Sequence, residues 1–237
     1  YQLDFTKGDN SLLVDGRLGS QATFSGNSVA DGDDNYFGTE ANDVFVASSG
    51  YDTFYAGNGV DKVIYAQNSN QFTFDQSLSD KLVVNAGTYV DQLIDVERVQ
   101  FSDQVRAFDW DGSAGQVYRL YQAAFDRTPD ASGLGYWIHF ADEGMSLEEI
   151  SGRFINSDEF ISLYGENISD EGFIEALYSN VLDRAPDQAG YDFWQAQLVG
   201  EEGISREKML ANFSESNENQ ENVNPLIELG FWFVDPF

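Results

Sequence analysis

A strict nine-residue period occupies the middle of the first half of the chain. Residues 29–64 divide without gaps into four units, which read VADGDDNYF, GTEANDVFV, ASSGYDTFY and AGNGVDKVI. Position six is always Asp, and position eight is always a large apolar residue. Small and polar residues fill positions one to six, which predicts a turn, and the last three positions predict a short strand with position eight facing the core. An exact period of nine therefore predicts a repetitive stack of turns and strands.

This pattern resembles G-G-x-G-x-D-x-U-x, the nonapeptide of the repeat-in-toxin, or haemolysin-type, calcium-binding family. The resemblance implies a parallel β-roll in which two units complete one coil. Turns on one edge of the roll are then 18 residues apart. Asp34 is expected to face Asp52 on one edge, and Asp43 to face Asp61 on the other, with one Ca²⁺ ion for each pair.

The predicted calcium ligands are the residues of these turns. Carboxylate oxygens and inward-pointing backbone carbonyls are the hard ligands that Ca²⁺ prefers, and Gly adopts unusual backbone dihedrals at little steric cost. The predicted set is Asp34, Asp43, Asp52, Asp61, Gly32, Gly38, Gly50, Gly57 and Gly59. The alternative is a calcium-free β-solenoid whose Asp residues only cap turns, but facing carboxylates without a cation would repel each other.

Flanking segments are expected to complete this β domain. Residues 1–28 should add strands, and residues 74–109 should cover the open end of the roll, because an uncovered sheet edge invites aggregation. The unit at 65–73 has Asn in place of the position-six Asp, which predicts a closing unit with at most a weak third site. Glu97 and Arg98 are expected to form a structural ion pair.

The second half contains a longer repeat. Residues 121–137 and 178–194 share the pattern Y-x4-D-R-x-P-D-x-x-G-x3-W at an offset of 57 residues. Apolar residues around the start of each copy recur at helical spacing, which predicts two helical modules with Trp137 and Trp194 in their cores. The signature resembles a domain of unknown function that occurs in bacterial secreted and surface proteins.

The acidic residues also divide the chain. Residues 1–110 contain 15 Asp and 2 Glu, whereas residues 111–237 contain 10 Asp and 14 Glu. Asp favours turns, and Glu tolerates helix interiors. We therefore predict an α+β protein with separate domains: a calcium-binding parallel β-roll with flanking strands at 1–111, and an all-α domain of two repeated helical modules with a C-terminal tail at 112–237.

Charge and composition exclude several function classes. With 12 Lys and Arg against 41 Asp and Glu, the net charge is −29, and such a field repels nucleic acids and anionic membrane surfaces. No apolar stretch is long enough to insert into a membrane. The chain has no Cys, one His and no phosphate-binding Gly-rich loop, so we predict that it is not an enzyme.

We therefore expect a non-catalytic calcium-binding region of a secreted bacterial protein, extracellular or at the cell surface, that folds or is stabilised on Ca²⁺ outside the cell. The resemblance implies type I export, and the apolar end at 231–237 is typical of that signal, unless it docks on the helices. Two alternatives remain: an adhesion or matrix module that binds polysaccharide or a surface protein, and an auxiliary C-terminal domain of a larger secreted hydrolase. Because the chain begins with Tyr1, we expect it to be a piece of something longer.

Overall fold

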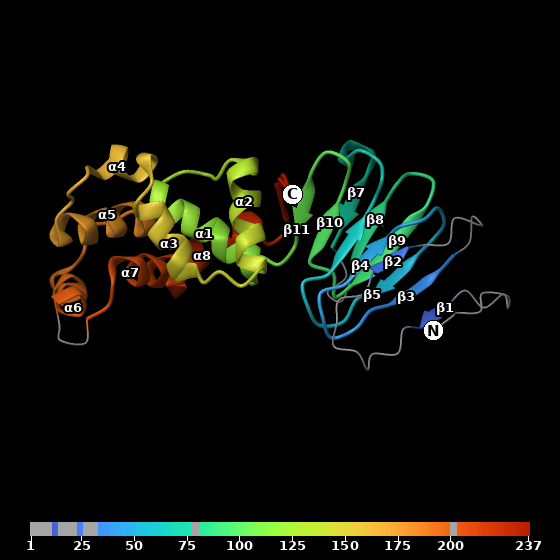
Figure 1. The fold of residues 1–237 in the computed structure, drawn as a ribbon, viewed down its shortest axis with the longest axis horizontal. Helices are drawn as coiled ribbons and strands as arrows, with labels where there is room; N and C mark the ends of the chain where they lie inside the picture. The colour runs from blue at the N-terminus through green and yellow to red at the C-terminus, as the bar shows by residue number, and fades with distance from the viewer. Residues whose placement is uncertain (1–10, 14–22, 26–32, 77–80, 200–202) are drawn as a thin grey trace. The chain divides into compact units, whose positions relative to one another are not determined.

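The computed structural model describes residues 11–13, 23–25, 33–76, 81–199 and 203–237. The chain divides into two compact units, Tyr1–Phe108 and Asp109–Phe237. Strands build the first unit and helices dominate the second (Figure 1). The strand-rich and helical halves predicted from the sequence are therefore both present. Gly32, one of the predicted ligands, lies outside the described residues.

The strands of the first unit form two sheets, and the first six strands alternate between them. The first sheet has the order β1–β3–β5–β9–β8–β7, and the strands of this unit in the second sheet have the order β11–β10–β6–β4–β2. The strands are β1 (Ser11–Leu13), β2 (Thr23–Ser25), β3 (Asn35–Phe37), β4 (Val44–Val46), β5 (Thr53–Tyr55), β6 (Lys62–Ile64), β7 (Thr73–Asp75), β8 (Leu82–Asn85), β9 (Val90–Ile94), β10 (Arg98–Gln100) and β11 (Val105–Ala107).

The nine-residue period sets the register of these sheets. Tyr36 pairs with Phe54 in one sheet and Phe45 pairs with Val63 in the other, and both pairs are parallel at a separation of 18 residues. All four side chains are buried. The Phe45 ring contacts the rings of Tyr36 and Phe54 edge to face, so position eight of each unit fills the core between the two sheets, as predicted.

Both sheets are mixed rather than purely parallel. β1, β3, β5 and β9 pair in parallel, as do β2, β4, β6 and β10. Antiparallel pairs then add β8 and β7 to the first sheet and β11 to the second. The segment at 74–109 thus supplies both parallel and antiparallel strands.

The unit at 65–73 does not continue the parallel coil. Its centre forms a short 3-10 helix, η1 (Ser69–Gln71), in which the Asn68 side chain accepts a hydrogen bond from the Asn70 N–H. The next coil comes instead from β9 and β10, because Phe54 pairs with Leu93 and Val63 pairs with Val99. The unit at 65–73 thus ends the run of nonapeptides, as a closing unit should, and the Asn68 side chain caps the turn that replaces the next coil. The weak third site at this unit stays a prediction.

The second unit consists of two sets of four helices and one short strand. The first set is α1 (Ser113–Phe125), α2 (Ala131–Asp142), α3 (Leu147–Ile155) and α4 (Asp158–Tyr164). The second set is α5 (Asp170–Leu182), α6 (Gln188–Val199), α7 (Arg206–Ser214) and α8 (Asn217–Ile227), and the strand is β12 (Phe231–Phe233). None of the described helices combines the length and the apolar character needed to cross a lipid bilayer.

Equivalent contacts recur in the two sets of helices. Arg127 pairs with Glu159 at 2.6 Å in the first set, and Arg184 pairs with Glu218 at 2.9 Å in the second. Trp137 packs on Phe154, and Trp194 packs on Phe213. Both Trp side chains are half-buried rather than central to the core.

The end of the chain packs on α2. Phe231 and Phe233 are buried, and β12 contacts α2. The Val234 N–H donates to the Ala131 carbonyl at 3.0 Å. A Cβ on Gly135 would lie 1.9 Å from the Val234 carbonyl oxygen, so glycine permits this close approach. Docking on a helix, the alternative to an export signal, is the arrangement that the structure shows for this segment.

Candidate metal centre

The position-six Asp residues lie in two ladders, one on each edge of the strand unit. The Asp34 N–H donates to the Asp52 Oδ1 at 3.1 Å. On the other edge, the Asp43 N–H donates to the Asp61 Oδ1 at 2.6 Å. The structure therefore brings together the pairs that the 18-residue spacing predicts, and each carboxylate reaches back to the preceding turn of its own edge.

Each ladder continues past the nonapeptides with an acidic residue whose place there sequence reasoning missed, since Glu97 was expected only as the ion-pair partner of Arg98. The Asp52 N–H donates to the Asp91 Oδ1 at 3.0 Å, and the Asp61 N–H donates to the Glu97 Oε2 at 2.7 Å. Asp91 and Glu97 immediately precede residues that pair with the strands after Asp52 and Asp61. Glu97 lies directly before β10, but Asp91 lies within β9, so no shared sequence signal identifies the two residues.

The carboxylates of these ladders are deeply buried. Asp43, Asp52, Asp61 and Asp91 expose at most 1% of their surface. Burial raises the pKa of Asp61 to about 7, and repulsion from Glu97, Asp43 and Asp95 contributes further. Burying an ionised carboxylate is costly unless hydrogen bonds or a cation compensate it, so these edges are places where a cation would stabilise the fold.

The same physical cause raises the pKa of four further carboxylates in the ladders. Burial raises the pKa of Asp91 to about 6, although hydrogen bonds from the Asp52 backbone and the Tyr65 hydroxyl oppose the shift. The pKa values of Asp34, Asp52 and Glu97 are also raised, in each case chiefly by desolvation. Both edges therefore hold negative charge in an environment that disfavours it.

The second carboxylate oxygen distinguishes Asp61 from its neighbours in the repeat. The Oδ2 atom of Asp61 is buried and has no hydrogen-bond partner among the residues that the structure describes. The Oδ2 atom of Asp43 accepts a hydrogen bond from the Thr39 hydroxyl at 2.9 Å, and that of Asp52 accepts one from the Ser48 hydroxyl at 3.0 Å. A buried, unpartnered carboxylate oxygen is the donor chemistry that a hard divalent cation requires.

The predicted glycines allow successive turns to stack closely. Gly50, Gly57 and Gly59 have φ values of 128°, 101° and 135°, which side chains rarely adopt. A Cβ on Gly38 would lie 2.1 Å from the Ala56 carbonyl oxygen. Ala41, which replaces Gly at position four of its unit, is not among the described residues with positive φ, so its turn differs in conformation from the two that follow.

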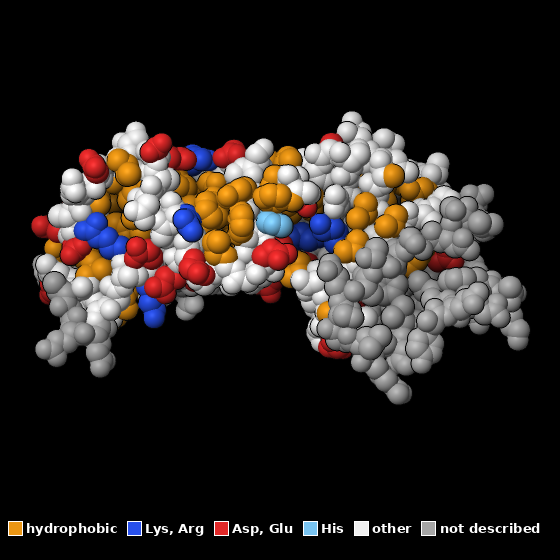
Figure 2. Space-filling view, viewed as in Figure 1, with side chains coloured by type: hydrophobic (Ala, Val, Ile, Leu, Met, Phe, Trp, Pro, Cys, Tyr) orange, Lys and Arg blue, Asp and Glu red, His pale blue; other side chains and the backbone are white. Residues whose placement is uncertain are grey.

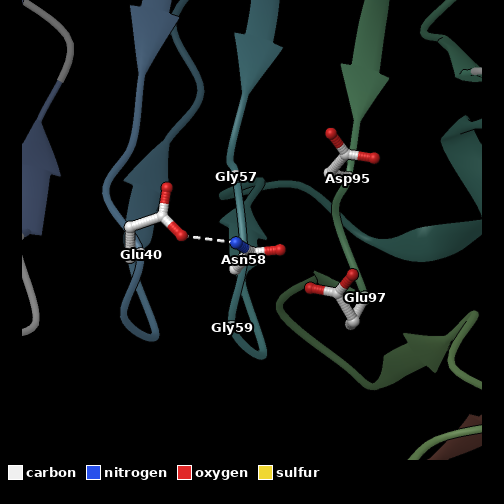
Figure 3. Close-up of a pocket in the computed structure, with 6 residues that line it drawn as sticks. All are labelled: Glu40, Gly57, Asn58, Gly59, Asp95 and Glu97. Atoms are coloured by element: carbon white, nitrogen blue, oxygen red, sulfur yellow. Dashed lines mark hydrogen bonds between the residues drawn. The ribbon is translucent and has the colours of Figure 1, made fainter.

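A pocket lies on the edge that carries Asp43 and Asp61. Figure 3 shows side chains from three neighbouring turns around it, and the Asn58 amide donates a hydrogen bond to the Glu40 carboxylate. The lining residues are Glu40, Gly57, Asn58, Gly59, Asp95 and Glu97. Within the described part of the chain, no three acidic or His side chains converge closely enough to hold a metal ion by themselves. Backbone carbonyl oxygens would have to complete any calcium site here.

Comparison with known families matches both halves of the chain. The chain carries RTX calcium-binding nonapeptide repeats, since the family model with that description, in four copies, matches residues 29–63 and 37–70. The model described as Domain of unknown function (DUF4214) matches residues 151–223. Both resemblances inferred from the sequence are confirmed. The repeats indicate a calcium-binding region of a secreted protein.

Among solved structures, the chain is similar to extracellular lipase LipA from Serratia marcescens. The identity is 16% and the TM-score is 0.17, and the match covers 34% of this chain and 14% of the lipase chain. The similarity therefore spans a small part of the lipase. No curated protein sequence matches this chain.

Proposed function

We propose that this chain, which carries RTX nonapeptide repeats, is a non-catalytic calcium-binding region of a secreted bacterial protein. In this proposal the strand unit is a β-roll that Ca²⁺ stabilises outside the cell. One observation carries the proposal: the Asp61 Oδ2 atom is buried without a hydrogen-bond partner among the described residues. Repulsion from the carboxylates of Glu97, Asp43 and Asp95 adds to the cost of holding a negative charge on Asp61.

The residues present fit a calcium ion by their chemistry. The carboxylates of Asp34 and Asp52 would contribute on one edge, and those of Asp43 and Asp61 on the other, together with backbone carbonyls of their turns. Every one of these ligands is a hard oxygen. When bound, Ca²⁺ would balance the negative charge of the buried carboxylates. The glycines with positive φ would let neighbouring turns approach closely enough to bind the same ion.

The expected stabilisation is large for a unit of this size. Extracellular calcium modules bind with dissociation constants of about 10⁻⁴ to 10⁻³ M. Free calcium at about 10 mM, 100-fold above the tighter of these constants, stabilises the bound state by about 2.7 kcal/mol per site. Two sites would contribute about 5 kcal/mol, which is comparable with the stability of a whole small domain. Such a unit would remain loosely folded where calcium is scarce, which suits passage through a type I exporter.

Calcium uptake by the full chain tests the proposal. Isothermal titration calorimetry in millimolar CaCl₂ should show saturable binding by the wild-type chain and loss of that binding in the double variant Asp52→Asn with Asp61→Asn. A variant that loses the same two charges elsewhere, Glu166→Gln with Glu221→Gln, is the matched control, because both side chains are exposed in the helical unit. It should bind calcium as the wild type does. A wild-type chain that takes up no calcium would refute the proposal.

A second candidate function is an adhesion module, and one observation favours it. Tyr136 packs on Phe140, and the His139 ring lies 4.2 Å from the ring of the exposed Phe237. Figure 2 shows hydrophobic side chains gathered on this face of the helical unit. Exposed aromatic rings are suited to stacking on sugars. Binding of the full chain to immobilised polysaccharides, lost in a Tyr136→Ala variant, would support this function, and no binding to any polysaccharide would count against it.

A further inference from the structure

Position two of the nonapeptides separates the described turns into two kinds. In the RTX pattern this position is Gly, but here it is Thr39 in one unit, Ser48 in the next and Gly57 in the third. Each precedes the position-six Asp of its own turn by four residues. The two hydroxyl-bearing turns satisfy their Asp side chains from within, and the glycine turn does not.

The turn at 38–43 shows how this works. The Thr39 N–H and the Thr39 hydroxyl both donate to the Asp43 Oδ2, at 2.5 Å and 2.9 Å. The hydroxyl also accepts a hydrogen bond from the Ala41 N–H at 3.2 Å. Thr39 therefore links position four to position six within one turn. The carboxylate that this arrangement compensates is fully buried.

The turn at 47–52 repeats the main contact. The Ser48 hydroxyl donates to the Asp52 Oδ2 at 3.0 Å, while the Asp52 Oδ1 accepts the N–H of Asp34. Both oxygens of this buried carboxylate thus have a donor from the protein. A hydrogen bond to a charged group is among the stronger ones, so the turn has local compensation for its charge.

The turn at 56–61 cannot use the same device. Gly57 has no side chain, its φ is 101°, and a Cβ at this position would lie 2.3 Å from the Thr39 carbonyl oxygen. A Ser or Thr at residue 57 would therefore be strained and would collide with the neighbouring turn. Consistent with this, the Asp61 Oδ2 lacks a hydrogen-bond partner among the described residues.

We propose that the hydroxyls of Thr39 and Ser48 compensate the Asp43 and Asp52 carboxylates while no calcium is bound, so that the turns at 38–43 and 47–52 form before an ion binds. The turn at 56–61, which has Asp61 and no hydroxyl, is then the calcium-dependent one. This inference rests on the proposed calcium binding and adds to it a division of the repeats into preformed turns and one turn that calcium orders.

Hydrogen exchange of the full chain, followed by mass spectrometry in EDTA and in millimolar CaCl₂, tests this division. In the wild type, peptides covering 38–46 and 47–55 should be protected in EDTA, and the peptide covering 56–64 should gain most of its protection on adding calcium. In the variant Thr39→Val with Ser48→Ala, protection of the first two peptides in EDTA should fall by about 10- to 100-fold, and calcium should restore it.

The neighbouring substitution Ser49→Ala is the matched control, because it removes a hydroxyl from the exposed position three of the same repeat. It should leave protection unchanged in both conditions. Peptides of the helical unit serve as an internal reference for overall folding. If the Thr39→Val, Ser48→Ala variant lost protection equally in EDTA and in calcium, the hydroxyls would be structural only. If its calcium affinity fell, they would be ligands rather than compensating donors. Either result would overturn the inference.

The test also separates this inference from the proposed function. If calorimetry shows that the wild-type chain takes up no calcium, the proposed function fails and this inference fails with it. If the wild type binds calcium but the hydroxyl variant exchanges like the wild type in EDTA, only this inference fails. Uniform protection of all three turns by calcium in the wild type would also refute it, while leaving calcium binding intact.

Discussion

Replacing Asp61 with Asn would test the electrostatics of the buried edge most directly. The Asp61 carboxylate is completely buried, and desolvation raises its pKa to about 7 from the ordinary 3.8. The Asn side chain keeps an oxygen for the Asp43 N–H and carries no charge. We expect the calcium-free Asp61→Asn protein to be more stable than the calcium-free wild type at pH 8.

The size of the effect follows from the pKa of Asp61. A rise from 3.8 to about 7 is about three units, and each unit corresponds to about 1.4 kcal/mol. The ionised carboxylate therefore destabilises the folded, calcium-free state by at most about 4 kcal/mol at pH 8. Relaxation of the surrounding turn reduces this figure, so we expect a gain of about 2–4 kcal/mol in the free energy of unfolding of the strand unit.

The same pKa fixes the direction of the pH dependence. Between about pH 4 and pH 7 the folded state retains the Asp61 proton that the unfolded state has already released. The calcium-free wild type should therefore lose stability as the pH rises through this window. The loss of stability with rising pH should be smaller in Asp61→Asn. The part that remains should come chiefly from Asp91, whose pKa is raised to about 6, with contributions from the raised pKa values of Asp34, Asp52 and Glu97.

Urea unfolding in EDTA at pH 5 and pH 8 provides the assay. Trp110, Trp137, Trp194 and Trp232 all lie in the helical unit, so tryptophan emission follows that unit alone and far-ultraviolet circular dichroism follows both. Glu166→Gln is the matched control, because it removes one exposed charge from the helical unit, and it should change the stability of the strand unit little. The reasoning is refuted if Asp61→Asn is less stable than the wild type in EDTA at pH 8.

Two further predictions concern the helical unit. Arg119 is buried, makes a two-point contact with Glu215 at 2.7 Å and also donates to the Trp110 carbonyl. Arg119→Ala should lower the free energy of unfolding by about 3 kcal/mol, measured as a tryptophan transition at lower urea concentration. An unchanged transition would contradict the role of this ion pair. In Gly135→Ala the new methyl group would collide with the Val234 carbonyl. Hydrogen exchange at 231–234 should therefore accelerate while α1 stays protected. Unchanged exchange at 231–234 would show that this contact does not hold the terminus.

The register of the repeat could be predicted from the sequence because it depends on local periodicity. Position eight is apolar in every unit, and the parallel pairs place these side chains between two sheets at the predicted spacing of 18 residues. The same logic placed Asp34 beside Asp52 and Asp43 beside Asp61. Four repeated units constrain each other, so one atypical residue such as Ala41 does not shift the pairing.

The continuation of the ladders could not be predicted, because it depends on contacts distant in sequence. Asp91 lies 39 residues after Asp52, and Glu97 lies 36 residues after Asp61. Between the last nonapeptide and these residues the chain makes a 3-10 turn and an antiparallel pair. No fixed period crosses that excursion, so only the three-dimensional pairing of β9 with β5 and of β10 with β6 reveals that the position-six role recurs.

The distribution of charge also decides how calcium binding must be measured. Residues 111–237 contain 24 acidic and 6 basic residues, a net charge of −18, and Arg127, Arg184 and Arg206 are already paired with acidic partners within the helical unit. Its remaining carboxylates will attract divalent cations weakly and with strong screening by salt. The number of bound ions therefore combines specific and diffuse association. Diffuse association depends on ion charge, whereas a closely packed oxygen site discriminates by ion size. The hydrogen-exchange protection of the turn at 56–61 should therefore be compared between Ca²⁺ and Mg²⁺ at equal concentration, because a difference between the two ions reports the specific site alone.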